Sequence, residues 1–146
     1  MSLKDWQTNG WLAPHQTSRQ EIADLLAVVD RDLVDAGTAG LSADWRLNIA
    51  YNAALQAATA ALAASGYRAS REAHHHRVIQ SLEFTIGADA TLISQLDKFR
   101  KKRNLGGYER IGVVSDHEAG EMLNLARKLR GSVLQWLRDH HPLLLP

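Results

Sequence analysis

The sequence contains no cysteine and only three prolines among its 146 residues. Without cysteine the chain can hold no disulfide, no thiolate-bound metal and no cysteine nucleophile, which fits a reducing compartment. No proline occurs between Pro14 and Pro142, so this long stretch lacks the strongest helix breaker. No apolar run reaches the ~20 residues that a membrane-spanning helix needs, and the first residues lack the pattern of an export signal. We therefore expect a cytoplasmic protein with no membrane segment.

Neither sign of charge is in excess, since 17 Lys and Arg face 16 Asp and Glu for a formal net charge of +1. A chain so close to neutral does not coat polyanions with its whole surface. Its length is that of one ordinary domain with its own core. Alanine and leucine, both strong helix formers, dominate the composition, and β-branched runs are nearly absent, which favours an all-α fold.

Capping residues and apolar periodicity predict the helices. Ser18 with Glu21, and Ser115 with Glu118, have the spacing of a capping box at the start of the first and last helices. Glycines end the predicted helices between them. The pattern predicts five helices, at about 18–37, 42–65, 70–86, 89–105 and 115–140.

Short connections between these helices indicate an all-α, antiparallel up-and-down bundle of four to five helices. We assign residues 1–17 to an irregular or briefly helical lead-in, anchored onto the body by Trp6 and Trp11. Residues 18–141 form the single helical domain, and residues 142–146 form a tail.

The second predicted helix is rich in alanine and apolar nearly all round, which is typical of a central element. Its polar exceptions, Asn48 and Asn52, are four residues apart and share one face. Buried amides need hydrogen-bond partners, so the two asparagines either fix the register between helices or line a ligand cleft beside Arg103.

The segment 97–110 holds six basic residues against two acidic ones. Helical geometry places Arg103 on the apolar stripe of its helix, while the lysines 98, 101 and 102 face solvent. Arg103 is therefore directed at the bundle or at a partner subunit, where an unpaired guanidinium would be costly. It either caps carbonyls or pairs with a carboxylate at the end of the bundle, or it serves a functional site.

Three consecutive histidines, His74, His75 and His76, open the third predicted helix. Consecutive helical residues point in three directions, so they cannot form one metal site, and we expect no metal. His75 lies on the apolar stripe, where it is either a hydrogen-bonded core residue or an imidazole that reaches Arg103. His74 and His76 are candidates to line the same cleft.

The order of these parts resembles a HEPN domain (higher eukaryotes and prokaryotes nucleotide-binding) over roughly residues 18–140. The resemblance rests on the alanine-rich second helix, a Gly-Tyr-Arg step, a histidine-bearing helix start and a basic helix end closed by a tyrosine. The segments that carry it are Ala50-Tyr51-Asn52-Ala53-Ala54, Gly66-Tyr67-Arg68, His74-His75-His76, Arg100-Lys101-Lys102-Arg103-Asn104 and Tyr108.

The resemblance implies a helical bundle, usually dimeric, in which arginine motifs of two subunits face each other across a cleft. Many members of the family are metal-independent ribonucleases, and others bind nucleotides or act with a nucleotidyltransferase in toxin–antitoxin pairs. The family motif places a histidine a few residues beyond the arginine, where this sequence has Tyr108. A tyrosine of ordinary pKa ~10 removes a proton poorly near neutral pH, whereas a neutral imidazole does so readily.

The sequence thus predicts an RNA- or nucleotide-binding module of the toxin–antitoxin type, without a cofactor. Arg103 and Asn104 would contact phosphate, Tyr108 would assist, and Arg100, Lys101 and Lys102 would attract the nucleic acid. The expected partners are a second copy of the chain and a companion antitoxin or nucleotidyltransferase. Two alternatives stay open. One is a structural or partner-binding bundle without a nucleic-acid role, and the other is a metal-independent ribonuclease with a base from residues 74–76.

Overall fold

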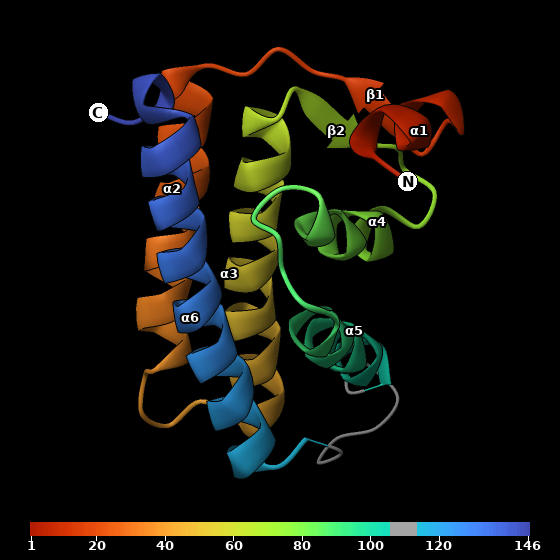
Figure 1. Ribbon diagram of the computed structural model, residues 1–146. Helices are drawn as coiled ribbons and strands as arrows, with labels where there is room; N and C mark the ends of the chain where they lie inside the picture. The colour runs from red at the N-terminus through yellow and green to blue at the C-terminus, as the bar shows by residue number, and fades with distance from the viewer. Residues whose placement is uncertain (106–113) are drawn as a thin grey trace.

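The computed structural model describes residues 1–105 and 114–146, with side chains up to residue 103 and from residue 114. The expected all-α bundle is confirmed in these residues. Three long helices lie side by side (Figure 1), α2 (Arg19–Ala36), α3 (Ala43–Ala64) and α6 (Asp116–His140). The central one is α3, which packs along both α2 and α6. None of the described helices is both long and apolar enough to span a bilayer.

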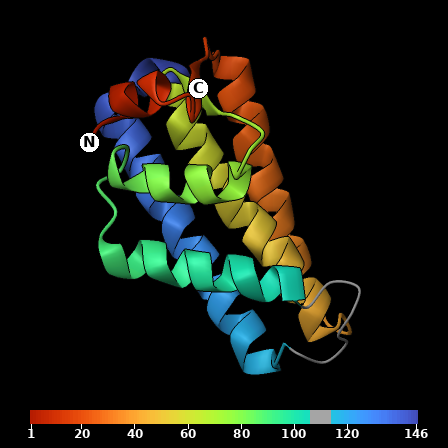
Figure 2. The same ribbon diagram turned by 90° about the vertical axis from the view of Figure 1, so that its right-hand side faces the viewer.

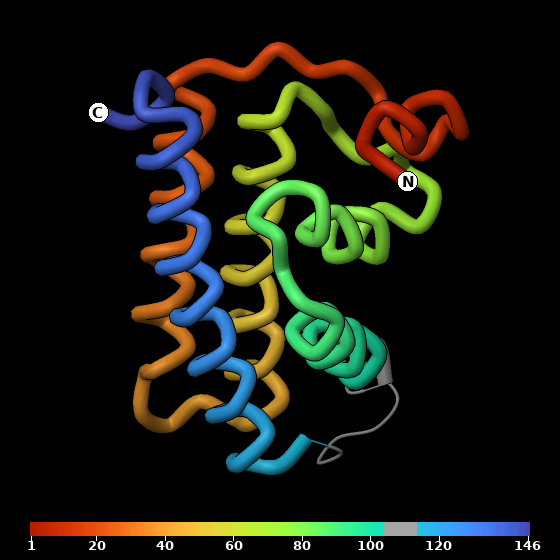
Figure 3. Tube along the Cα trace, viewed as in Figure 1, coloured from red at the N-terminus to blue at the C-terminus, as the bar shows by residue number. Residues whose placement is uncertain are grey.

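Two shorter helices cross the outer side of α3. They are α4 (His74–Gln80), continued by a 3-10 turn η1 (Ser81–Glu83), and α5 (Ala90–Leu105). Figure 2 shows both running across the long helices and in opposite directions to each other. The chain then enters α6 at the lower end of the bundle, so α6 runs antiparallel to α2 and in the same direction as α3 (Figure 3).

The alanine-rich sequence of α3 explains its central place. Alanine loses no side-chain conformational entropy when a helix forms, and its small side chain lets neighbouring helices approach closely. The buried positions of α3 cover most of its circumference, as predicted. Tyr51 is the aromatic residue among these buried positions. It is 1% exposed, and buried alanines lie near it in the sequence.

Helix starts agree with the predicted caps. The hydroxyls of Ser18, Ser42 and Ser115 each accept a hydrogen bond from the backbone three residues on. Both halves of the capping box are present at Ser115 and Glu118. The box predicted at Ser18 is only half formed, because the Glu21 carboxylate accepts hydrogen bonds from Thr17 and His15 instead.

The third predicted helix begins later than expected, at His74 rather than residue 70. Residues Tyr67–Ala69 form a strand, β2, that pairs antiparallel with β1 (Leu12–Pro14). The strand pairing joins segments more than fifty residues apart, so local periodicity could not reveal it. The lead-in is therefore ordered: a short helix α1 (Leu3–Thr8) buries Trp6, and the Arg77 guanidinium lies 3.7 Å from the centroid of a Trp11 ring.

Candidate functional site

Arg103, Tyr51 and His75 meet where α3, α4 and α5 come together, and we call these three residues the Arg103 cluster. The guanidinium carbon of Arg103 lies 5.3 Å from the centroid of the Tyr51 ring. The Tyr51 hydroxyl and His75 Nδ1 are 3.3 Å apart, and the centroids of the two rings are 5.8 Å apart. Side chains from three helices thus contact one another in sequence.

The predicted stripe on α5 explains the position of Arg103. Leu96 and Phe99, which share the stripe, are buried in the core, and Arg103 follows on the same side of the helix. The prediction that Arg103 is directed at the bundle is therefore confirmed. Small residues flank Tyr51 on α3, which leaves room for its ring between α3 and the crossing helices.

Arg103 has no ordinary partner among the described residues. Its Nε atom is buried without a hydrogen-bond partner, and no described carboxylate forms an ion pair with it. Among the described residues, Arg103 therefore neither caps a backbone carbonyl nor pairs with a carboxylate, as the structural alternative would require. An aromatic face stabilises a partly buried cation only in part, so such a cation favours the binding of an anion.

A second arginine reinforces the positive charge. Arg100 Nε donates a hydrogen bond to Asp97 Oδ1 at 2.9 Å, and Lys101 Nζ lies 3.4 Å from Oδ2. His76 Nδ1 lies 3.5 Å from the same carboxylate. Burial raises the pKa of Asp97, but Arg100, Lys101 and His76 together lower it by more. A single carboxylate is therefore shared among several cations, and the charge of Arg103 stays unbalanced.

Protonation states in the cluster follow from burial. Burial raises the pKa of Tyr51 to about 12, although the positive charges of Arg103 and Arg100 oppose the shift. Burial also lowers the pKa of His75, and the charges of Arg103, His74 and Arg100 lower it further. At neutral pH the cluster therefore holds a neutral phenol and a neutral imidazole beside a charged guanidinium.

The tautomer of His75 decides what the imidazole can do. When Tyr51 donates to Nδ1, the Nε2–H group is free to donate to an anion. When Nδ1–H donates to the Tyr51 oxygen, Nε2 is free to accept a proton. The same geometry thus serves either anion binding or general base catalysis.

The other basic residues predicted for the site are only partly in place. Lys101 is exposed beside Asp97, as expected for a solvent-facing lysine. Lys102 does not simply face solvent: its side chain is 26% exposed, and its Nζ lies 3.3 Å from Glu118 in the acidic first turn of α6. The side chain of Asn104, and Tyr108 altogether, lie outside the described residues.

Asn52 does not line a cleft beside Arg103. Its amide donates a hydrogen bond to Asp32 Oδ2 at 2.7 Å, and Gln56 donates to its oxygen at 3.2 Å. Asp32 is 5% exposed and also binds Arg31. Of the two interpretations drawn from the sequence, the interhelical hydrogen bond is correct for Asn52, because that side of α3 faces α2. Asn48 is half-buried one turn earlier.

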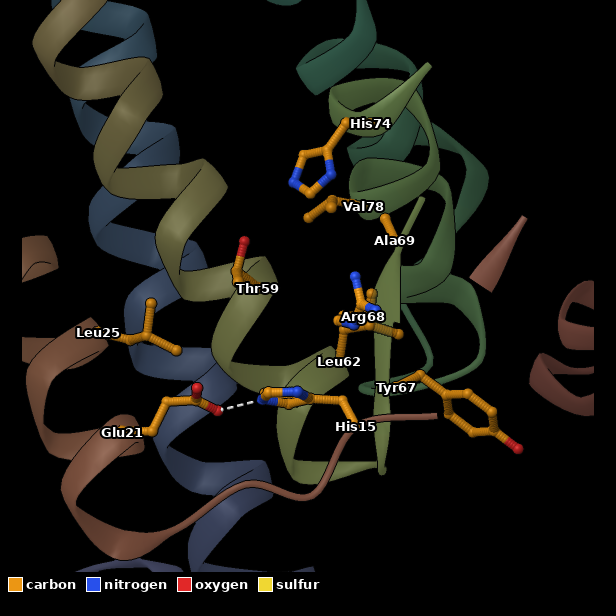
Figure 4. A pocket seen from close by; sticks show the side chains of 11 residues that line it. His15, Glu21, Leu25, Thr59, Leu62, Tyr67, Arg68, Ala69, His74 and Val78 are labelled. Carbon is orange, nitrogen blue, oxygen red and sulfur yellow. Dashed lines mark hydrogen bonds and ion pairs between the residues drawn. The ribbon is translucent and has the colours of Figure 1, made fainter. Parts of the chain in front are cut away.

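The three histidines separate, as consecutive helical residues must. His75 joins the Arg103 cluster, and His76 contacts Asp97 rather than Arg103. His74 lines a cavity of about 190 Å³ between α2 and α4 (Figure 4). In the described ranges, no group of three or more His, Asp or Glu side chains could hold a metal ion.

Sequence reasoning did not select Tyr51 as a site residue, nor Asp97. The one available signal for Tyr51 was a large aromatic residue within a run of alanines on the central helix. Asp97 carried no signal, because its role depends on contacts with His76 on another helix.

Comparison with known proteins gives no relative: no family model, curated protein or solved structure matches this chain. Its function must therefore be inferred from the fold, the charge and the geometry of the Arg103 cluster.

Proposed function

We propose that this chain is an RNA- or nucleotide-binding module that holds a phosphate group at Arg103. The observation that carries the proposal is the Arg103 guanidinium, whose buried Nε has no partner among the described residues. A guanidinium presents its donors as a planar fork that fits phosphate oxygens bidentately. A phosphate bound here satisfies the orphaned donor and balances the charge.

The surroundings of Arg103 suit the same ligand. Arg100 and Lys101 lie on the neighbouring turn and share one carboxylate, so the local charge stays positive with Asp97 ionised. His75 can donate its Nε2–H group to a phosphate oxygen while Tyr51 bonds to Nδ1. The resemblance of the basic helix end to HEPN domains supports the proposal independently of these contacts.

The proposal includes the partners that the resemblance implies. We propose that the chain acts as a homodimer, with a companion antitoxin or nucleotidyltransferase in a toxin–antitoxin pair. Light scattering coupled to size exclusion gives the molar mass of the purified chain. A mass of one chain at all concentrations contradicts the homodimer.

The direct test of phosphate binding is the affinity for a labelled single-stranded RNA, measured by fluorescence polarisation over a series of salt concentrations. For Arg103→Ala we expect a loss of about 10- to 150-fold, since a hydrogen bond to a charged group contributes about 1.5–3 kcal/mol. The slope of log affinity against log salt should also fall by about 0.7 for one lost phosphate contact on a single strand. Lys98→Ala is the matched control, because Lys98 is an exposed cation on the same helix.

Two results contradict the proposal. Equal affinity of wild type and Arg103→Ala means that Arg103 holds no phosphate. Absence of any RNA or nucleotide binding, together with loss of the dimer in Arg103→Ala, favours the structural alternative, in which the arginine holds two subunits together.

A ribonuclease activity is the second candidate, and the position of His75 favours it. With Nδ1–H bonded to Tyr51, the free Nε2 lies in a neutral imidazole beside Arg103, because burial lowers the pKa of His75. Nε2 would remove the proton from a ribose 2′-hydroxyl, whose oxygen attacks the adjacent phosphorus. The bond from phosphorus to the 5′-oxygen breaks, and the leaving oxygen takes a proton from water to give a 5′-hydroxyl. Arg103 would stabilise the charge on the phosphate oxygens.

The products distinguish cleavage from binding alone. RNA incubated with the protein in the presence of a metal chelator should yield fragments that end in a 2′,3′-cyclic phosphate. The His75→Gln variant should not produce these fragments. His117→Gln is the control, since His117 is an exposed histidine that pairs with Glu121. If the RNA is bound but stays intact after prolonged incubation, the ribonuclease activity is excluded and the binding function stands.

A further inference from the structure

The cavity lined by His74 lies on α3 near the Arg103 cluster, in the angle between α2 and α4. Figure 4 shows Leu25 and Glu21 on the α2 side, His74 and Val78 on the α4 side, and Thr59 and Leu62 on α3 between them. Its floor is apolar, because Leu62 and Val78 are buried core residues. A solvent-accessible hollow with an apolar floor favours the burial of a flat apolar group.

The edge of the cavity carries planar nitrogen-bearing groups. His15 and His74 contribute imidazole rings from opposite sides, and Arg68 contributes a guanidinium from β2. Arg68 is exposed and makes no hydrogen bond or ion pair within the described part of the chain. Imidazole rings and guanidinium planes are the surfaces on which proteins stack unpaired RNA bases.

Glu21, the one carboxylate among the described residues that line the cavity, is already engaged. It accepts a hydrogen bond from Thr17 at 2.6 Å and lies 2.7 Å from His15 Nε2. These two hydrogen bonds lower the pKa of Glu21, so it stays ionised and bound at neutral pH. Glu21 therefore holds the His15 ring in place. Arg68 has no such partner among the described residues, so its guanidinium is available to an anionic ligand at the edge of the cavity.

A row of rings connects this cavity with the Arg103 cluster. The centroids of the His74 and His75 rings are 6.1 Å apart, and His75 in turn contacts Tyr51, beneath Arg103. On α3, the eight residues from Tyr51 to Thr59 correspond to a rise of about 12 Å. A strand bound by its phosphate at Arg103 can therefore place a neighbouring base in this cavity.

We infer that the cavity is a nucleobase subsite for the RNA strand whose phosphate is bound at Arg103, an inference that rests on the function proposed above. The base enters between His15 and His74 and lies on the apolar floor formed by Leu62. Arg68 stacks on the exposed face of the base. The site is therefore specific for single-stranded RNA, because a base paired in a duplex cannot enter the cavity.

The test compares two ligands of equal length and charge, a short oligoadenylate and a ribose-phosphate oligomer without bases. Wild-type protein should bind the oligoadenylate about 5- to 150-fold more tightly, the range expected when one base stacks. Thr59→Phe fills the cavity with an aromatic ring. It should abolish this preference while leaving the affinity for the abasic oligomer unchanged.

Arg68→Ala gives a second test that does not change the interior. It should reduce the preference for the oligoadenylate several-fold, whereas Arg71→Ala, an exposed arginine outside the cavity lining, should not. Circular dichroism and thermal melting confirm that each variant is folded.

The outcomes separate this inference from the function on which it rests. If Thr59→Phe and Arg68→Ala keep the wild-type preference while Arg103→Ala loses affinity for both oligomers, the base subsite is refuted and the phosphate site stands. If Arg103→Ala binds both oligomers as wild type does, the phosphate site is refuted and the subsite with it.

Discussion

Replacing Arg103 by methionine should stabilise the protein while it weakens RNA binding by about 10- to 150-fold. Methionine has nearly the same length as arginine and no charge, and it fills irregular apolar gaps well. The side chain would keep its packing on the Tyr51 ring and on the buried stripe of α5 that ends with Phe99. It would remove a buried Nε–H group that has no partner among the described residues.

The expected magnitude is the difference between two terms. A buried polar group left without a hydrogen bond costs about 1–3 kcal/mol, and Arg103→Met removes that cost. The cation–π contact of Arg103 with Tyr51, at 5.3 Å from the ring centroid, contributes about 0.5–2 kcal/mol and is lost. The free energy of unfolding should therefore rise by about 1 kcal/mol.

Urea unfolding followed by circular dichroism measures this change. Arg77→Met is the matched control, because Arg77 lies closer to its aromatic partner, 3.7 Å from the centroid of a Trp11 ring, and serves the fold. Arg77→Met should lower the free energy of unfolding by about 0.5–2 kcal/mol. A similar or larger loss for Arg103→Met would refute the reasoning, since it would show that Arg103 stabilises the bundle.

Three further predictions concern the polar contacts of the fold. Asn52→Ala removes the amide that donates to the buried Asp32 carboxylate, so it should lower the free energy of unfolding in urea by about 1.5–3 kcal/mol. RNA affinity should stay unchanged, and a lower affinity would show that Asn52 lines the site after all. Ser115→Ala removes the α6 cap and should cost about 0.5–2 kcal/mol by the same assay, where an unchanged midpoint would contradict the capping assignment. Because the pKa of His75 is lowered from 6.5, mainly by burial, the unfolded chain binds its proton at a higher pH than the folded chain. Stability should therefore fall as the pH drops below about 6.5. His75→Gln should flatten that dependence, to which His141 contributes in the same direction because burial also lowers its pKa; an unchanged slope would contradict the assigned burial of His75.

Local signals in the sequence predicted most of the helical framework. Ser42 and Ser115 are caps because a hydroxyl placed before a helix satisfies backbone donors three residues away, which needs no tertiary contact. Gly66 has φ of +95°, a conformation that favours glycine, and it follows the last turn of α3 as expected. The inward direction of Arg103 followed from helical periodicity alone.

Contacts between distant segments limited the prediction elsewhere. The pairing of Leu12 with Ala69 shortens the third predicted helix, and no local pattern announces it. Lys102 has the position of a solvent-facing lysine on its own helix, but Glu118 on α6 lies within reach. The hydrogen bond between Tyr51 and His75 likewise joins residues from two helices, so the sequence could name His75 as a candidate but not its partner.

The central claim, that phosphate binds at the Arg103 cluster, is tested most directly by the pKa of the His75 imidazole. Nuclear magnetic resonance of the histidine ring protons follows this pKa with and without a short single-stranded RNA. A phosphate beside His75 favours the charged imidazole, so saturating RNA should raise its pKa. The ring signals of the exposed His117 should not respond to the RNA. An unchanged pKa of His75 in a sample where RNA is demonstrably bound would show that the phosphate lies elsewhere on the protein.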